Sequence, residues 1–144
     1  MKIPTHLKHK PIIAVENYNR IDGPYDPEKT DAKGLSVGIA QWNTVGLTHL
    51  SAKVWRNTGE KWSRQSEELP LHRAIDLATL VCIAIDHSKN ERLSSSDEFS
   101  VSRATDNPEL ARHTELMKKE LKKNEAFLDA SLKRLSEELK RIGY

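Results

Sequence analysis

Cysteine is almost absent from this chain. The one cysteine, Cys82, lies in the apolar run 78–85, and a single cysteine excludes both an intrachain disulfide and a zinc site built on cysteine pairs. This pattern is typical of a reducing compartment, so we expect a cytoplasmic protein. The neighbours of Cys82 are apolar or uncharged, which predicts a buried core residue, because a nucleophilic thiolate needs a basic neighbour.

Long hydrophobic runs and a charge excess are missing too. No apolar stretch approaches the roughly 20 residues that cross a bilayer. The polar N-terminus, interrupted at Pro4 and Pro11, does not resemble a signal peptide. The 23 basic and 21 acidic residues leave a net charge of +2, so bulk charge does not predict a nucleic-acid partner. We expect no membrane partner either. A chain of 144 residues, 37% of them hydrophobic, is enough for one folded domain.

Familiar catalytic and metal-binding motifs are also lacking. There is no glycine-rich phosphate loop and no Gly-x-Ser-x-Gly motif. The six histidines are scattered, and the pair His72 and Asp76, one turn apart on a predicted helix, is typical of a structural contact. We therefore expect no cofactor, no metal and no catalysis. A small enzyme that uses His72 or His49 is the alternative.

Alternating residues predict an antiparallel sheet of three to five strands. On the strand 35–42, the small residues Gly38 and Ala40 share one face, which indicates close approach by another backbone or by a ligand. The turn between the last two strands contains Gly59, which tolerates a positive φ. The expected strands are 11–16, 35–42, 47–56 and 61–65.

A helix is predicted from residue 66 to residue 87. Glu67 and Glu68 suit the first turn of a helix, and Pro70 suits an early helical position. The segment is apolar on nearly all sides, so we expect it to be buried between the sheet and a second layer. This arrangement, with a long amphipathic helix at the C-terminus, is an α+β fold.

The final segment, 108–142, is predicted to be one helix roughly 50 Å long. Its apolar stripe repeats every seven residues, and Asn124 falls within the stripe. One small domain cannot cover a stripe of this length, so we expect a dimer or larger homo-oligomer in which Asn124 fixes the register. A helix lying over its own domain is the alternative. The expected organisation is a core domain 1–88, a polar linker 89–107 and an oligomerisation helix 108–144.

Basic and aromatic residues concentrate on the predicted hairpin 53–66. Guanidinium groups grip phosphate, and an indole ring can stack on a base. The alternative is that the tryptophans pack across strands beside a solvated basic face. In the ligand hypothesis, Trp55 or Trp62 stacks on a base, Arg56, Lys61 and Arg64 contact phosphate, Arg73 assists, and Arg20 and Tyr25 close over the ligand from the loop 17–34.

Several segments resemble a small bacterial family of unknown function. They are 9–13, 19–23, 38–43 and 51–77, within a region of roughly 5–85 that leaves the last helix out. The resemblance implies no activity. In size and layout alone, the chain is also similar to phage sponge proteins that sequester cyclic nucleotide signals.

We therefore expect a non-catalytic, homo-oligomeric binding protein for an anionic ligand such as a nucleotide or cyclic oligonucleotide. The alternative is a scaffold protein that acts through its C-terminal helix, with a purely structural hairpin.

Overall fold

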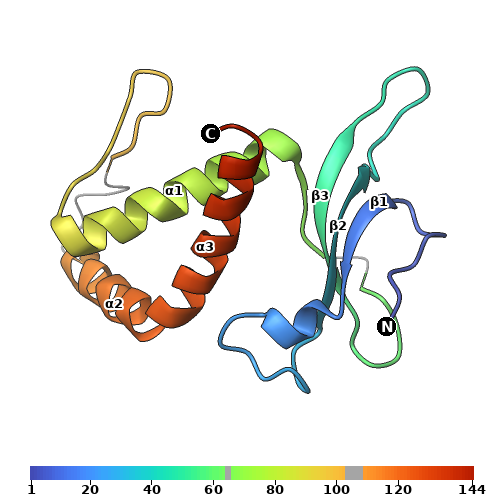
Figure 1. Cartoon of the computed structure of the whole chain (residues 1–144), viewed down its shortest axis with the longest axis horizontal. Coiled ribbons are helices and arrows are strands. Elements are labelled where there is room, and N and C mark those ends of the chain that lie inside the picture. Colours follow the sequence, from blue (N-terminus) through green and yellow to red (C-terminus); the bar gives the residue numbers. More distant parts are fainter. Residues whose placement is uncertain (64–65, 103–108) are drawn as a thin grey trace. The chain divides into compact units, whose positions relative to one another are not determined.

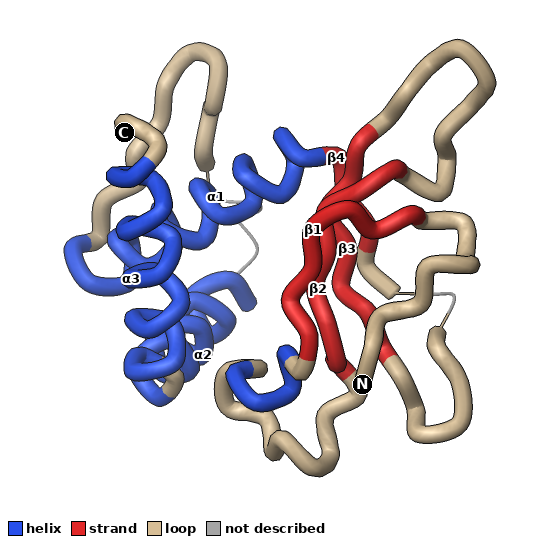
Figure 2. The backbone as a smooth tube through the Cα atoms, turned by 45° about the vertical axis from the view of Figure 1, so that its right-hand side comes forward, coloured by secondary structure: helices blue, strands red, loops and turns tan. Residues whose placement is uncertain are grey.

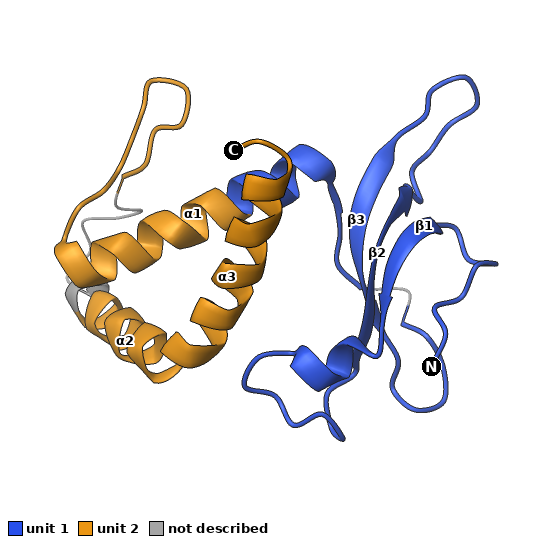
Figure 3. Ribbon diagram, in the orientation of Figure 1, with its two compact units in different colours: residues 1–77 blue, residues 78–144 orange. Residues whose placement is uncertain are grey.

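The computed structural model describes residues 1–63, 66–102 and 109–144 (Figure 1). The fold is α+β, as predicted. The chain divides into two compact units, residues 1–77 and residues 78–144 (Figure 3). In chain order the elements are β1 (Lys10–Glu16), the short 3₁₀ helix η1 (Tyr18–Ile21), β2 (Ala32–Ile39), β3 (Leu50–Arg56), β4 (Glu68–Pro70), α1 (Leu71–Asn90), α2 (Glu109–Lys123) and α3 (Glu125–Arg141).

The predicted boundary at residue 88 falls inside the second unit, and the independence of the predicted segments stays a prediction. Among the described residues, none of the helices is long and apolar enough to span a membrane.

The sheet has the strand order β1-β2-β3-β4, and each neighbouring pair is antiparallel (Figure 2). The predicted turn after β3 is present: Gly59 has a φ of 100°, and Asn57 pairs with Trp62 across it. The predicted strand 61–65 is wrong in its described part, because the pairing ends near Trp62. From Glu67 the described chain pairs with β3 again, since the Glu67 carbonyl accepts from the Val54 N–H at 2.8 Å, and in β4 Glu68 lies opposite Lys53. Residue 65 and its neighbour Arg64 lie outside the described residues.

The expected close approach at Gly38 is confirmed, and the neighbour is a backbone. A Cβ atom added at Gly38 would lie 2.0 Å from the carbonyl oxygen of Lys10. Residue 38 pairs with Pro11 beside a bulge in β1. Glycine is therefore the residue that lets β1 and β2 come this close.

The polar face of the sheet is the buried one. Ser36, Ser51, Lys53 and Trp55 are all at most 7% exposed. Side chains of the opposite, apolar face are more exposed, with Ile13 at 70%. The core of the first unit therefore lies on the face with more polar side chains.

Helix α1 differs from the prediction in its start and in its burial. It begins at Leu71, because Glu68 and Pro70 belong to the edge strand β4, where proline needs no ladder partner for its missing N–H. None of its residues is buried, and Cys82 is exposed. The predictions of a buried helix and of a buried Cys82 are both wrong.

The predicted single C-terminal helix is two helices. Helix α2 ends at Lys123, α3 begins at Glu125, and Asn124 lies between them. The backbone N–H and the side-chain amide of Asn124 both donate to the carbonyl of Glu120, at 3.0 Å each. The amide thus competes for a helical acceptor and helps to end the helix. The prediction of one continuous helix through Asn124 is wrong, whereas the register of an oligomer stays a prediction. The start predicted at residue 108 lies outside the described residues.

Candidate functional site

Trp55 is the best-buried residue of the predicted hairpin site. It is 0% exposed, and its indole N–H donates to Ser36 Oγ at 2.8 Å. The rings of His9 and Trp62 contact it edge to face, with centroids 5.7 and 5.9 Å away. Neither face of the indole is open to a base, so the assignment of Trp55 to a ligand is corrected to a core role.

Arg56 is held by two carboxylates. Its Nη1 lies 2.6 Å from Asp31, and its Nε and Nη2 lie 3.0 and 2.5 Å from the two oxygens of Glu67. Its hydrogen bonds to Glu67 and then to Asp31 raise the pKa of Arg56 above its usual value, and the hydrogen bond that Glu67 accepts from Arg56 lowers the pKa of Glu67. The guanidinium fork is thus occupied within the chain, which disagrees with its prediction as a phosphate ligand.

The other predicted site residues lie on separate segments. Trp62 is partly buried against Trp55, and Lys61 is exposed in the hairpin turn. Arg73 is exposed in α1, Arg20 is exposed in η1, and Tyr25 is 66% exposed in the loop that follows. Arg64 lies outside the described residues. A ligand role for these residues stays a prediction.

Four polar side chains form a buried network that the sequence did not predict. His9 Nε2 lies 2.9 Å from Ser36 Oγ, and His9 Nδ1 lies 2.9 Å from Glu68 Oε1. Ser51 donates to the same Glu68 oxygen at 2.7 Å, and so does the backbone N–H of Gln41 at 2.9 Å. These contacts join the N-terminal arm, β2, β3 and β4 on one face of the sheet.

The network also encloses a pair of opposite charges. Lys53 Nζ lies 3.8 Å from Glu68 Oε2, and the two side chains are only 6% and 1% exposed. Burial lowers the pKa of Lys53, although Glu68 and Glu67 oppose this effect. Burial alone would raise the pKa of Glu68, but hydrogen bonds from Ser51, Gln41 and His9 together bring it below its usual value. The carboxylate is therefore the favoured form of Glu68.

The chain Ser36–His9–Glu68 has the order of a serine–histidine–carboxylate relay. A nucleophile must reach its substrate, however, and Ser36 is only 5% exposed. Its oxygen also accepts the Trp55 N–H. The arrangement therefore fits a structural network that fixes four segments to one another.

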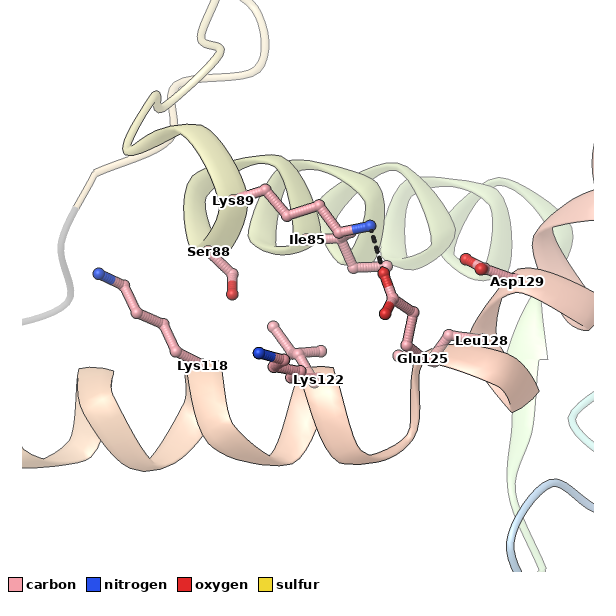
Figure 4. Close-up of a pocket in the computed structure, with 9 residues that line it drawn as sticks. Ile85, Ser88, Lys89, Lys118, Lys122, Glu125, Leu128 and Asp129 are labelled. Carbon is pink, nitrogen blue, oxygen red and sulfur yellow. Dashed lines mark hydrogen bonds and ion pairs between the residues drawn. The ribbon is translucent and has the colours of Figure 1, made fainter.

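The second unit contains a pocket of about 290 Å³ among α1, α2 and α3 (Figure 4). Its walls combine aliphatic side chains with charged ones, and more of the lining is apolar than polar. The aliphatic part comes from all three helices. The lining residues are Ile85, Ser88, Lys89, Lys118, Leu121, Lys122, Glu125, Leu128 and Asp129.

The charges around this pocket are unequally engaged. Lys89 Nζ forms a 2.8 Å ion pair with Glu125, and this hydrogen bond raises the pKa of Lys89 and lowers that of Glu125. Lys118 Nζ lies 3.3 Å from Glu91 and 3.6 Å from Glu115. In Figure 4, Lys118 lies at the far end of the pocket from the Lys89–Glu125 pair.

Lys122 lies between these two ends of the pocket. Figure 4 shows its ammonium group and the hydroxyl of Ser88 in the space between α2 and α1. The lining carries three lysines and two carboxylates, and Glu91 and Glu115 lie beside Lys118 outside it. The arrangement can hold a small anion over an aliphatic floor.

The family model of DUF6530, described as a family of unknown function, matches residues 1–144. The chain belongs to this family. Membership in DUF6530 confirms the expected resemblance to an uncharacterised family and extends it over the C-terminal helices. No curated protein and no solved structure matches the chain.

Sequence reasoning missed the DUF6530 chain's helical pocket for a definite reason. Leu121 and Leu128, seven residues apart, were assigned to a seam between copies. The break at Asn124 instead places them on two helices that both face one pocket. Lysines beside a leucine stripe look like an ordinary solvated helix face in sequence, so they gave no signal for a pocket.

Proposed function

We propose that this protein is a non-catalytic binding protein for a small anionic ligand, held in the pocket among α1, α2 and α3. The observation that carries the proposal is the placement of Lys118 and Lys122 over the aliphatic floor of one pocket. Apolar walls with a few converging polar groups are typical of ligand sites.

This proposal keeps the expected ligand class and moves its site. The hairpin offers a buried Trp55 and an Arg56 that two carboxylates already hold. The pocket offers lysines and a hydroxyl around an open volume. Binding there needs no covalent step, so no catalytic residue is invoked.

Thermal denaturation with a panel of anions tests the proposal. The panel contains inorganic phosphate, mononucleotides, cyclic dinucleotides and aliphatic carboxylates. A ligand that binds the native state raises the melting temperature. At 100 times its Kd it adds about 2.7 kcal/mol to the free energy of unfolding. The pocket variant Lys118→Gln/Lys122→Gln should lose this shift. The control Lys119→Gln/Lys123→Gln, on the same helix but outside the pocket lining, should keep it.

Two results contradict the proposal: no anion raises the melting temperature, or the pocket variant responds like the control. If a nucleotide shift survives in the pocket variant and disappears in Lys61→Gln/Arg73→Gln, the ligand belongs to the hairpin hypothesis instead.

We also propose a second function, self-association through α3. Leu135, Leu139 and Ile142 of the predicted stripe are 39%, 40% and 68% exposed in the single chain. An amphipathic helix with an open apolar stripe is suited to packing against a copy of itself. This keeps the expected homo-oligomer and the scaffold alternative.

A further inference from the structure

The ligand class of the helical pocket is restricted by what lines it. No aromatic side chain is among the residues that line it within the described part of the chain. Base recognition relies on stacking against aromatic or guanidinium planes, and this lining provides neither. Its volume of about 290 Å³ is at the lower end of the roughly 300–1,000 Å³ of ligand sites. The pocket therefore suits a ligand smaller than a cyclic dinucleotide.

The charge of the lining restricts the ligand further. Glu125 and Asp129 contribute negative charge at the α3 side of the pocket, and Lys89 is already paired with Glu125. Glu91 and Glu115 both lie within 4 Å of Lys118 Nζ. Lys122, whose charge also acts on Glu125, and the hydroxyl of Ser88 are the donors on the α2 and α1 walls. A single carboxylate matches these two donors, whereas a polyphosphate would also meet the acidic side chains.

The aliphatic floor indicates what the rest of the ligand is. Ile85, Leu121 and Leu128 come from α1, α2 and α3 and line the same pocket. Binding against these side chains becomes more favourable with every methylene group of the ligand that leaves water. A hydrocarbon chain fits this part of the lining better than a polar body.

Building on the proposed function, we infer that the pocket binds an aliphatic monocarboxylate, a free medium-chain fatty acid. The carboxylate accepts hydrogen bonds from Lys122 Nζ and Ser88 Oγ. The hydrocarbon chain lies along Ile85, Leu121 and Leu128. The affinity of the ligand depends both on its negative carboxylate and on the length of its hydrocarbon chain.

Calorimetric titration of the full chain with hexanoate, heptanoate, octanoate and decanoate tests the inference. The affinity should rise about fourfold for each added methylene, which is the 0.8 kcal/mol of one buried CH₂. The rise should stop once the chain fills the pocket. Octanol and octylamine, which have the same chain without the negative charge, should bind at least about tenfold more weakly than octanoate, because a hydrogen bond to a charged group is lost.

Matched variants separate the contribution of the ligand's carboxylate from that of its hydrocarbon chain. Lys122→Gln should weaken octanoate about tenfold, and Lys123→Gln, an adjacent exposed lysine outside the lining, should leave it unchanged. Leu121→Ala should reduce the gain per methylene, whereas Leu132→Ala, on α3 outside the lining, should not. Circular dichroism melting of each variant reports whether it is folded, so that a lost affinity is read only on a folded chain.

The failures are distinguishable. If phosphate or nucleotides bind in a Lys122-dependent way and carboxylates do not, the ligand class is wrong and the proposed function stands. If carboxylates bind equally well to wild type and Lys122→Gln, the association is nonspecific and the inference is overturned. If no anion binds in a Lys122-dependent way, both the inference and the proposed pocket function are overturned.

Discussion

Lys53 and Glu68 bring two opposite charges into the interior of the first unit. Removing such charges from water costs several kcal/mol per ion unless other contacts offset it. The cost of burying the charge of Glu68 is offset by hydrogen bonds from three donors, namely His9, Ser51 and the backbone N–H of Gln41. Lys53 has a 3.8 Å contact with Glu68 and lies 5.0 Å from the centre of the Trp55 ring. Its stabilisation therefore depends mainly on Glu68 remaining ionised.

The substitution Glu68→Gln should lower the free energy of unfolding by about 3 kcal/mol or more, because it leaves Lys53 as a buried charge without its partner. Urea unfolding followed by tryptophan fluorescence measures this change. Glu60→Gln, an exposed residue of the hairpin turn, is the matched control and should change little. A Glu68→Gln protein as stable as this control would contradict the role assigned to the pair.

Acidification should weaken the wild-type fold through the same residue. The folded pKa of Glu68 is below the usual 4.5, so the unfolded state takes up a proton first as the pH falls. Stability from Glu68 is complete above about pH 4.5 and is lost as the pH falls through the folded pKa. Urea unfolding from pH 6 to pH 3 should show this loss, and Glu68→Gln should flatten that part of the profile. Equal slopes in both proteins would contradict it.

Sequence reasoning did not identify which face of β3 is buried. Alternation placed Ser51, Lys53 and Trp55 on one face of β3, as the structure does, but alternation does not say which face is inside. The inner face is the more polar one because His9 and Glu68, far apart in sequence, satisfy its polar groups. Trp55 and Arg56 therefore looked like ligand groups when their partners were within the chain.

The close contact between β1 and β2 depends on Gly38, which has no side chain. Gly38→Ala would place a Cβ atom 2.0 Å from the Lys10 carbonyl oxygen and 2.8 Å from Pro11 Cα. Both neighbours are backbone atoms, so β1 would have to move away. Gly34→Ala meets mainly the flexible end of Ile3, at 2.6 Å, which can turn aside.

We expect Gly38→Ala to destabilise the protein by about 3 kcal/mol, at the upper end of overpacking effects, and Gly34→Ala to cost clearly less. Thermal and urea unfolding of both variants measure the difference. Hydrogen exchange should show the loss of protection concentrated in β1. A Gly38→Ala protein no less stable than Gly34→Ala would contradict the close approach.

The elements differ in how well the sequence defines them. The alternating pattern located β1, β2 and β3 to within a few residues, because sheet periodicity is visible locally. The start of α1 was not visible, since Pro70 suits both the first helical turn and the end of an edge strand. The choice is made by Glu68, which must face His9 and Ser51.

The break at Asn124 could not be read from the leucine rhythm. A polar residue in a heptad seam and a polar residue that ends a helix look identical in one sequence. The pocket among α1, α2 and α3 exists because the chain breaks there, so the lysines that line it gave no local signal.

For the molecule as a whole, the open question is what covers the second half of α3. The break at Asn124 gives Leu121 and Leu128 a place in the pocket lining. It does not cover Leu135, Leu139 or Ile142, which remain at least 39% exposed. The residues at and beyond Leu135 are therefore the part of the predicted stripe that still supports self-association.

The double substitution Leu135→Lys/Leu139→Lys should weaken the proposed dimer. Burying one leucine side chain contributes about 1.5–3 kcal/mol, so losing two in each copy should weaken association at least about a hundredfold. Sedimentation velocity over a range of concentrations measures the dissociation constant. The control Glu137→Gln/Lys140→Gln alters exposed polar neighbours on the same helix and should leave the dimer intact. A wild-type chain that sediments as a monomer at every concentration would contradict the proposal, and so would a double variant that associates as tightly as the control.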